Sequence, residues 1–323
     1  MTNVDYKKFN TKRYFGIELE IGNEIPISTI RETISCNSHI PVKTSYYRAS
    51  LNNSFWEVKH DGSCGKNVDK FGINEGGFEV TTFKGNSIKD LLHVCHIARK
   101  IKQKGCEVNK NCGLHVHIDV SDFDIETMGI LIANWLCIEK TMLQAVPNVR
   151  KNNKFCNPLS SLRPKLDPTA YLPKQVWDHY RPYSVKLHDN FDRRCAMNLV
   201  NYYRSMIVKN FKRPTVEFRF PEGTLVSRTI KNWARILINF VNNVANSKRM
   251  PEEIKPLNLH ETLQVLGLEG GKDEFFILSP GLYESKMWFL RRIQRYASYP
   301  FHELIAESKS ILQGMEFKNV YGG

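Results

Sequence analysis

Apolar and polar residues alternate strictly in several short segments of the first two thirds of the chain. Between Tyr14 and Gly22 the apolar residues fall at every second position and the intervening positions include Glu18 and Glu20. This pattern predicts a strand with one buried face. Shorter alternating or apolar segments predict further strands at residues 55–58, 78–82, 114–120 and 215–220.

Helical spacing replaces alternation in the longer apolar segments. We predict helices at residues 87–104, 125–145 and 230–244, the first with Ser87 as its N-cap and Gly105 as its stop. Further helices are expected near 257–266, 285–296 and 301–312. A sheet followed by helices predicts an α+β fold. We expect a catalytic domain at residues 1–250 and a C-terminal helical extension at 251–323 packed on it.

The segment 147–173 is polar and interrupted by prolines. It predicts a long loop, and connections of that length are usually functional or mobile. We therefore interpret it as a candidate substrate loop or lid.

Composition and charge limit the possible classes of protein. The 323 residues are 41% apolar, enough for a sizeable core. The N-terminal residues lack the apolar stretch of a signal peptide, and the longest apolar run, near 129–138, is too short to span a bilayer, so we expect a cytoplasmic protein without membrane contact. A net charge of +13 favours anionic partners, including nucleotides, acidic metabolites or an anionic polymer. The spacings of the eight cysteines predict reduced, buried thiols for most of them.

Three of the predicted strands carry reactive groups opposite their apolar face. Glu18 and Glu20 lie two residues apart in one strand, which places their side chains on the same face roughly 6 to 7 Å apart. Two carboxylates so placed repel each other, and a bound cation such as Mg²⁺ would offset this repulsion. His115 and His117 repeat this spacing with imidazoles, and Glu217 and Arg219 repeat it with opposite charges.

Each pair taken alone is compatible with the solvated face of an amphipathic strand. The three pairs together favour a chemical site. Glu79 adds a carboxylate on a fourth strand. Asp61 precedes Gly62 and is either a turn residue or a substrate contact.

These segments together resemble the amidoligase family, a branch of the carboxylate-amine ligases that includes glutamine synthetase and glutamate-cysteine ligase. The matching motifs span about residues 14 to 245. They are Phe15-Gly16-Ile17-Glu18-Leu19-Glu20, Asp61-Gly62-Ser63, Phe78-Glu79-Val80-Thr81-Thr82, Cys112-Gly113-Leu114-His115-Val116-His117 and Val216-Glu217-Phe218-Arg219-Phe220-Pro221-Glu222-Gly223-Thr224-Leu225.

The resemblance implies a glutamine synthetase-like fold, in which an antiparallel sheet packed with helices forms an active-site funnel for ATP and Mg²⁺. It implies metal ligands at Glu18, Glu20, Glu79, His115 and Glu217. It also implies ATP phosphate contacts at His117 and Arg219, and catalytic roles for Glu217 and Arg219. A permanently charged, planar guanidinium suits phosphoryl oxygens.

Substrate contacts are less well specified by the resemblance. Arg193, Arg194 and Asn198 lie where relatives carry a basic residue and an asparagine, so they are either acid-substrate contacts or ordinary residues preceding a strand. Together with Asp61, Arg194 and Asn198 form the predicted substrate-binding set. A further carboxylate ligand of glutamine synthetase has no counterpart here, which leaves the number of metal ions open.

The expected reaction is ATP-dependent amide formation through an acyl phosphate, with a small-molecule or peptide carboxylate and an amine as substrates. One alternative is a phosphotransferase on the same fold. A metallohydrolase would explain His115-x-His117-x-Asp119, but Val120 stands where that motif requires a histidine. A nucleic-acid-binding protein would explain the charge and aromatics such as Tyr46 and Tyr47, although no recognition motif accompanies them. The sequence leaves the oligomeric state open.

Overall fold

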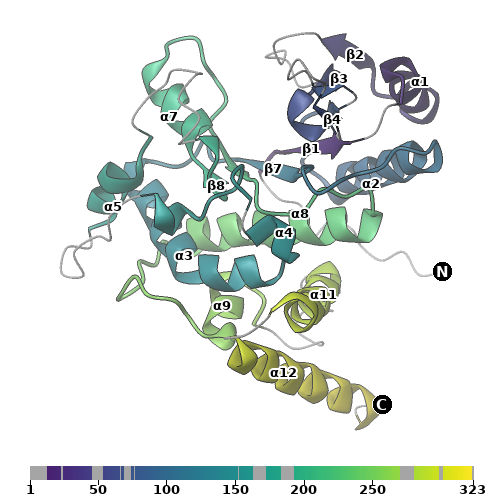
Figure 1. The fold of residues 1–323 in the computed structure, drawn as a ribbon. Helices are drawn as coiled ribbons and strands as arrows, with labels where there is room; N and C mark the ends of the chain where they lie inside the picture. The colour runs from purple at the N-terminus through teal and green to yellow at the C-terminus, as the bar shows by residue number, and fades with distance from the viewer. Residues whose placement is uncertain are drawn as a thin grey trace. The chain divides into compact units, whose positions relative to one another are not determined.

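The computed structural model describes residues 13–22, 25–45, 54–65, 67–68, 74–75, 77–151, 153–162, 172–182, 193–269, 280–297 and 301–321 (Figure 1). The chain forms two compact units, one of residues 1–119 and 217–234, the other of residues 120–216 and 235–323. The division predicted at residue 250 stays a prediction. Tyr46 and Tyr47 lie outside the described residues.

The first unit contains most of the strands. Its elements are β1 (Phe15–Ile21), α1 (Ile27–Asn37), β2 (Val42–Ser45), β3 (Trp56–His60), the 3-10 helix η2 (Gly62–Cys64), β4 (Asn67–Val68), β5 (Asn74–Glu75), β6 (Phe78–Thr81), α2 (Ile88–Gln103) and β7 (Leu114–Asp119). Strand β9 (Thr215–Phe218) and helix α8 (Ser227–Ser247) each cross between the units. The five strands predicted from alternation are therefore confirmed, with ends shifted by one or two residues.

The described strands form a seven-stranded sheet in the order β2-β3-β6-β1-β7-β9-β8 and a separate β4-β5 pair. Strand β1 pairs antiparallel with β6 on one side, where Glu20 lies opposite Glu79, and with β7 on the other, where Glu18 lies opposite His115. This places β1 at the centre of the first unit, between the two strands that carry the other predicted ligands.

The prediction of an antiparallel sheet is wrong for one pair. Strands β2 and β3 run parallel, with Val42 opposite Trp56, so the sheet is mixed. Strand β2 contains a single strongly apolar residue, and so short a segment carries no alternation from which its presence or direction could be predicted. The α+β class is confirmed, whereas the glutamine synthetase-like arrangement stays a prediction.

The two faces of the sheet in the first unit differ completely in chemistry. One face consists of apolar side chains in register across the strands: Phe15 opposite Ile118, Ile17 opposite Val116, Leu19 between Leu114 and Val80, and Ile21 opposite Phe78. Helix α2 packs on this face, where the His93 ring lies 6.0 Å from Trp56. The start of α8 also contributes an apolar side chain to the core of this unit, because the Trp233 ring packs edge-on against the Phe220 ring at 5.0 Å. The opposite face is left for polar groups.

Helix α2 begins at the predicted cap. The Ser87 hydroxyl accepts from the Asp90 backbone N–H at 3.1 Å, and the Asp90 carboxylate accepts from the Ser87 N–H at 3.0 Å, which forms a capping box. The helix stops at Gly105, whose φ of +87° is a left-handed conformation that favours glycine.

Removing this cap gives a first testable expectation. Ser87→Ala should lower the free energy of unfolding by about 1 kcal/mol, because it leaves the Asp90 N–H in the first turn of α2 without its side-chain acceptor. Chemical denaturation followed by circular dichroism measures the change. Ser28→Ala is the matched control, since Ser28 is an exposed serine in the first turn of α1 and should change stability by less than about 0.5 kcal/mol. Equal effects of the two substitutions would contradict the capping role.

The second unit is mainly helical. It contains α3 (Ile125–Gln144), α4 (Asn148–Lys151), the 3-10 helix η3 (Leu159–Ser161), α5 (Pro173–Tyr180), β8 (Met197–Asn198), α7 (Val200–Ile207), α9 (Leu259–Val265), α11 (Pro280–Tyr296) and α12 (His302–Tyr321). All six predicted helices are confirmed. Helix α3 is buried along most of its length, and the Trp135 ring lies 6.1 Å from Phe240 of α8.

Residues 147–173, predicted to be one long loop, contain α4 and η3 in their described part, and residues 152 and 163–171 lie outside it. Buried Glu139 of α3 holds this segment by accepting from the N–H groups of Leu159 at 2.6 Å and Ser160 at 3.0 Å. The prediction of an irregular loop is therefore wrong for α4 and η3, because helical turns this short carry no periodic signal. The lid role stays a prediction.

Two further features bear on function. Within the described residues, no helix is both long and apolar enough to span a membrane.

The second unit contains a cleft of about 710 Å³, a volume typical of small-molecule sites. None of the predicted site residues lines it; its walls are Val120, Ser121, Phe123, Asp124, Ile125, Glu126, Lys174, Tyr202, Ser205, Met206, Phe211, Lys212 and Pro214.

Candidate active site

The polar face of the first unit is built by cross-strand register. One row runs across four strands from Glu57 through Thr81 and Glu18 to His115. The neighbouring row runs from Lys59 through Glu79 to Glu20. Because directly opposed residues of paired strands share a face, these side chains converge although they are far apart in sequence. We call the set of Glu18, Glu20, Glu57, Lys59, Glu79, Thr81, His115, His117, Glu217 and Arg219 the polar face.

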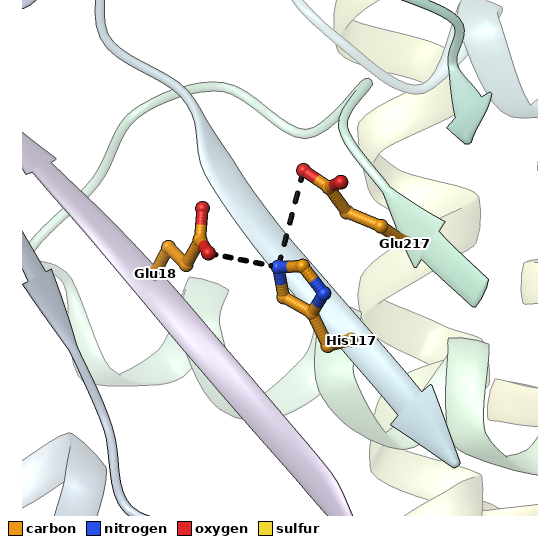
Figure 2. A group of neighbouring side chains, drawn as sticks. All are labelled: Glu18, His117 and Glu217. Atoms are coloured by element: carbon orange, nitrogen blue, oxygen red, sulfur yellow. Dashed lines mark ion pairs between the residues drawn. The ribbon is translucent and has the colours of Figure 1, made fainter. Parts of the chain in front are cut away.

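Glu18, His117 and Glu217 form a tight trio on three adjacent strands (Figure 2). Nε2 of His117 lies 3.0 Å from Oε1 of Glu18 and 3.9 Å from Oε1 of Glu217. One potential ligand atom from each of the three residues lies within 4.8 Å of the other two. The His117 Nε2 is buried and makes no hydrogen bond of good geometry with the described residues. Two carboxylates and an imidazole so placed fit a divalent cation.

His115 lies beside the trio and is more deeply buried. Its Nδ1 is 3.0 Å from Oε2 of Glu18 and 3.6 Å from Oε1 of Glu217, and its Nε2 is 3.4 Å from Oε1 of Glu20. Both ring nitrogens thus face carboxylates. A neutral imidazole can donate through only one nitrogen, so the other is available as a ligand.

The electrostatics differ between the two histidines. Burial and the Arg219 guanidinium lower the pKa of His115 to about 4. Burial also acts to lower the pKa of His117, but the carboxylates of Glu18 and Glu217 outweigh it and raise the value to about 9. In return, the two histidines hold the pKa of Glu18 well below its usual range despite burial. A positive charge on His117 therefore partly neutralises the two carboxylates of the trio, Glu18 and Glu217.

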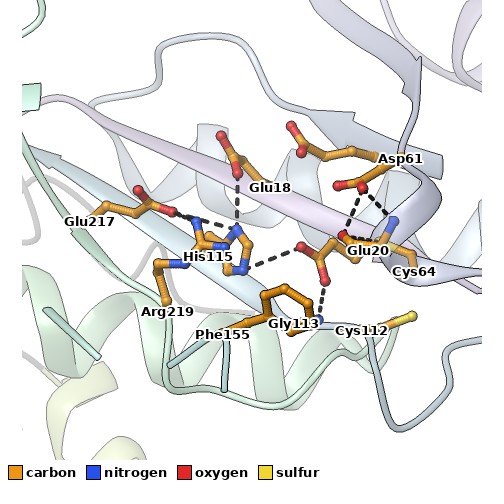
Figure 3. Close-up of polar contacts among 12 residues, drawn as sticks. Glu18, Glu20, Asp61, Cys64, Cys112, Gly113, His115, Phe155, Glu217 and Arg219 are labelled. Atoms are coloured by element: carbon orange, nitrogen blue, oxygen red, sulfur yellow. Dashed lines mark hydrogen bonds and ion pairs between the residues drawn. The ribbon is translucent and has the colours of Figure 1, made fainter. Parts of the chain in front are cut away.

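Glu20 has no such compensation. Burial, with the negative charges of Asp61 and Glu79, raises its pKa to about 8 against the opposing effect of Arg219. Its carboxylate accepts the backbone N–H of Gly113 (Figure 3). Glu20, Asp61 and Cys64 form a second group whose potential ligand atoms lie within 4.8 Å of one another. Near neutral pH the Glu20 carboxyl group is therefore mostly protonated unless a cation lies beside it.

Asp61 acts as a turn residue, one of the two roles open from its sequence. Its Oδ1 accepts from the N–H of Ser63 at 2.9 Å and from the Ser63 hydroxyl at 2.7 Å, which caps η2. A Cβ atom at Gly77 would lie 2.1 Å from the Asp61 carbonyl oxygen, so only glycine allows the turn to pack this closely against the start of β6. The role of Asp61 as a substrate contact stays a prediction.

Two permanent cations belong to the polar face. The Arg219 guanidinium donates to Oε1 of Glu217, and this contact, with His117, holds the pKa of Glu217 below its ordinary value despite burial. The Lys59 ammonium lies 2.7 Å from Oε1 of Glu79. Burial opposes the charge on Lys59, but Glu79 and Glu18 outweigh it and raise its pKa.

The structure brings most of the predicted site residues together. Glu18, Glu20, Glu79, His115, His117, Glu217, Arg219 and Asp61 all belong to the first unit. Arg194 and Asn198 belong to the second. There, Arg194 stacks on the Phe155 ring at 4.8 Å, and the Asn198 side chain accepts from the Val200 N–H at 2.9 Å. Their predicted substrate contacts stay predictions.

Sequence reasoning missed Glu57, Lys59 and Thr81 as members of the polar face, and Cys64 as a neighbour of Glu20. Lys59 stands two residues before Asp61 and two after Glu57 in an extended segment, so the two-residue spacing that identified Glu18 and Glu20 could have identified it. Cys64 lies in a turn, and no local pattern would have placed its sulfur beside Glu20.

Comparison with known proteins agrees with this geometry. A family described as "Putative amidoligase enzyme" matches residues 11–241, which include every residue of the polar face. The chain belongs to this amidoligase family. A search of curated proteins finds no match. Family membership indicates an enzyme of the ligase type.

Proposed function

We propose that this protein is an ATP- and Mg²⁺-dependent ligase that joins a carboxylate to an amine through an acyl phosphate. The observation that carries the proposal is the trio of Glu18, His117 and Glu217, with their potential ligand atoms within 4.8 Å of one another on an amidoligase sheet. Glu20 supports it, because burial raises the pKa of its carboxyl group to about 8 despite Arg219, and a nearby divalent cation would favour the ionised form.

Magnesium would be held by Glu18 and Glu217 with His117, and by Glu20 with His115 in the adjoining position. Carboxylate oxygens are ligands that Mg²⁺ prefers, and the buried Nε2 of His117, 3.0 Å from Glu18, would complete the set once a bound cation displaces its proton. When bound, the metal ions would neutralise charge on the phosphate oxygens of ATP.

The proposed reaction forms and breaks two bonds in turn. A carboxylate oxygen of the acid attacks the γ-phosphorus of ATP and the bond to the β-phosphate oxygen breaks, which releases ADP and leaves an acyl phosphate. The amine then attacks the acyl carbon, loses a proton and displaces phosphate, giving the amide. Arg219 is placed to stabilise the transferred phosphoryl group, because its planar fork can contact phosphate oxygens while one nitrogen remains on Glu217.

The test is Mg²⁺-dependent release of ADP and phosphate by purified protein supplied with ATP, ammonium and a pool of amino acids. The pool should stimulate turnover. Glu18→Gln and Glu217→Gln should each raise the Mg²⁺ concentration for half-maximal turnover at least about tenfold, because each removes one charged oxygen ligand. Glu32→Gln, at an exposed position of α1, is the matched control and should behave as wild type.

Other outcomes identify the alternatives. ADP release with a phosphorylated product and no amide would favour a phosphotransferase. No ATP binding and no turnover under any condition would reject the ligase and favour a binding protein. Turnover equal to wild type in both variants would reject the proposed metal ligands.

A further inference from the structure

Lys59 of the polar face contacts Glu79, one of the predicted metal ligands. This contact changes the role that we expect for Glu79. Its Nζ lies 2.7 Å from Oε1 of Glu79. The Thr81 hydroxyl donates to the same oxygen at 2.9 Å. The lysine side chain is 24% exposed and the glutamate side chain 8%. Oε1 of Glu79 therefore already receives two donors, one of them a full positive charge.

The backbone makes this contact a property of the fold. Lys59 lies opposite Glu79 in the β3-β6 ladder, and Glu79 lies opposite Glu20 in the β6-β1 ladder. Opposed residues on one face have Cβ atoms about 5 Å apart, so the lysine reaches Glu79 without leaving its strand. The cation thus sits at the end of the row that leads to Glu20.

A divalent ion and this ammonium would compete for the same carboxylate. A metal bound at Oε1 of Glu79 would lie within a few ångströms of the Lys59 charge, and like charges at that separation in a partly buried site repel strongly. Lys59 also interacts electrostatically with Glu18, but its direct contact, at 2.7 Å, is with Glu79.

We propose that Lys59 is a built-in cation of the site, which neutralises Glu79 and occupies the position that a further divalent ion would otherwise take. Glu79 then anchors Lys59 instead of ligating Mg²⁺. The ammonium has three donors, so those not used by Glu79 can contact an anionic oxygen of a phosphate or carboxylate substrate. The inference deepens the proposed function and rests on it.

The test is equilibrium binding of Mn²⁺, followed by electron paramagnetic resonance, to wild type, Glu79→Gln, Lys59→Met and the double variant. Mn²⁺ prefers the same oxygen ligands as Mg²⁺ and needs no turnover to be counted. Glu79→Gln should leave the number of bound ions and their affinity within about twofold of wild type. Lys59→Met should add one ion, or tighten binding at least about tenfold, and the double variant should lose that gain.

Controls separate this inference from the proposed function. Lys59→Arg keeps the charge and should bind Mn²⁺ as wild type does, whereas Glu18→Gln should weaken binding if the proposed metal centre is correct. Wild type without bound Mn²⁺, together with a Lys59→Met variant that binds it, would reject the metal-dependent function and keep the inference.

Two results would overturn the inference. In the first, Glu79→Gln weakens Mn²⁺ binding as much as Glu18→Gln does, which makes Glu79 an ordinary ligand. In the second, Lys59→Met gains no binding. Thermal unfolding checks that each variant is folded, and Lys59→Gln, polar and uncharged, replaces Lys59→Met under the same criteria if the latter does not fold.

Discussion

Arg219→Lys should slow ATP turnover by about 10²-fold to 10³-fold, with little change in Mn²⁺ binding. The lysine keeps the positive charge beside Glu217, so the charge balance of the polar face is preserved. It lacks the planar fork, which allows Arg219 to hold Glu217 and a phosphoryl oxygen together. The loss should fall mainly on kcat, because this contact strengthens as charge develops on the transferred group.

Steady-state kinetics with varied ATP, together with Mn²⁺ binding on the same preparations, measure this expectation. Arg228→Lys is the matched control, since Arg228 is exposed in the first turn of α8 and should retain wild-type turnover. If Arg219→Lys turns over ATP at the wild-type rate, Arg219 is only the counter-ion of Glu217. A rise in KM without a change in kcat would make it a ground-state contact.

Glu139→Ala should have the largest effect on stability, lowering the free energy of unfolding by about 3–5 kcal/mol. Glu139 is 1% exposed and accepts from the indole N–H of Trp135 at 2.8 Å as well as from the N–H groups of Leu159 and Ser160. Alanine would leave donors without an acceptor and a cavity beside Trp135.

Denaturant unfolding measures the loss, and limited proteolysis near residues 153–162 should show local release of the segment that Glu139 holds. Glu139→Gln keeps one carbonyl acceptor and should fall between alanine and wild type. Glu126→Ala, at an exposed position in the first turn of the same helix, should cost less than about 1 kcal/mol. An equal cost for Glu126→Ala and Glu139→Ala would contradict the anchoring role.

Alternation was sufficient to predict the strands that build the polar face. Ile17 and Leu19 are buried and Glu18 and Glu20 share the opposite face, as the two-residue period requires. Periodicity failed where elements are short. Strand β2 has four residues and one strongly apolar side chain, and its parallel pairing depends on β3, which local sequence does not encode.

The site was predictable as a set of residue types but not as a set of pairs. Pairing depends on register between strands, and register places His117 beside Glu18, and Lys59 beside Glu79. The sequence predicted His117 as a phosphate contact and Glu79 as a metal ligand. Both residues have neighbours that no motif of five or six residues could specify, because those neighbours come from other strands.

The strict division of the sheet into an apolar and a polar face limits how related chains can vary in length. Inserting or deleting one residue within β1 or β7 would exchange the faces beyond that point, placing glutamates in the core and isoleucines at the site. Changes in length should therefore be tolerated better between strands than within them. We therefore expect that divergence among members of this family, including that which alters the substrate, accumulates in the connecting segments, while the spacing from Phe15 to Ile21 stays constant.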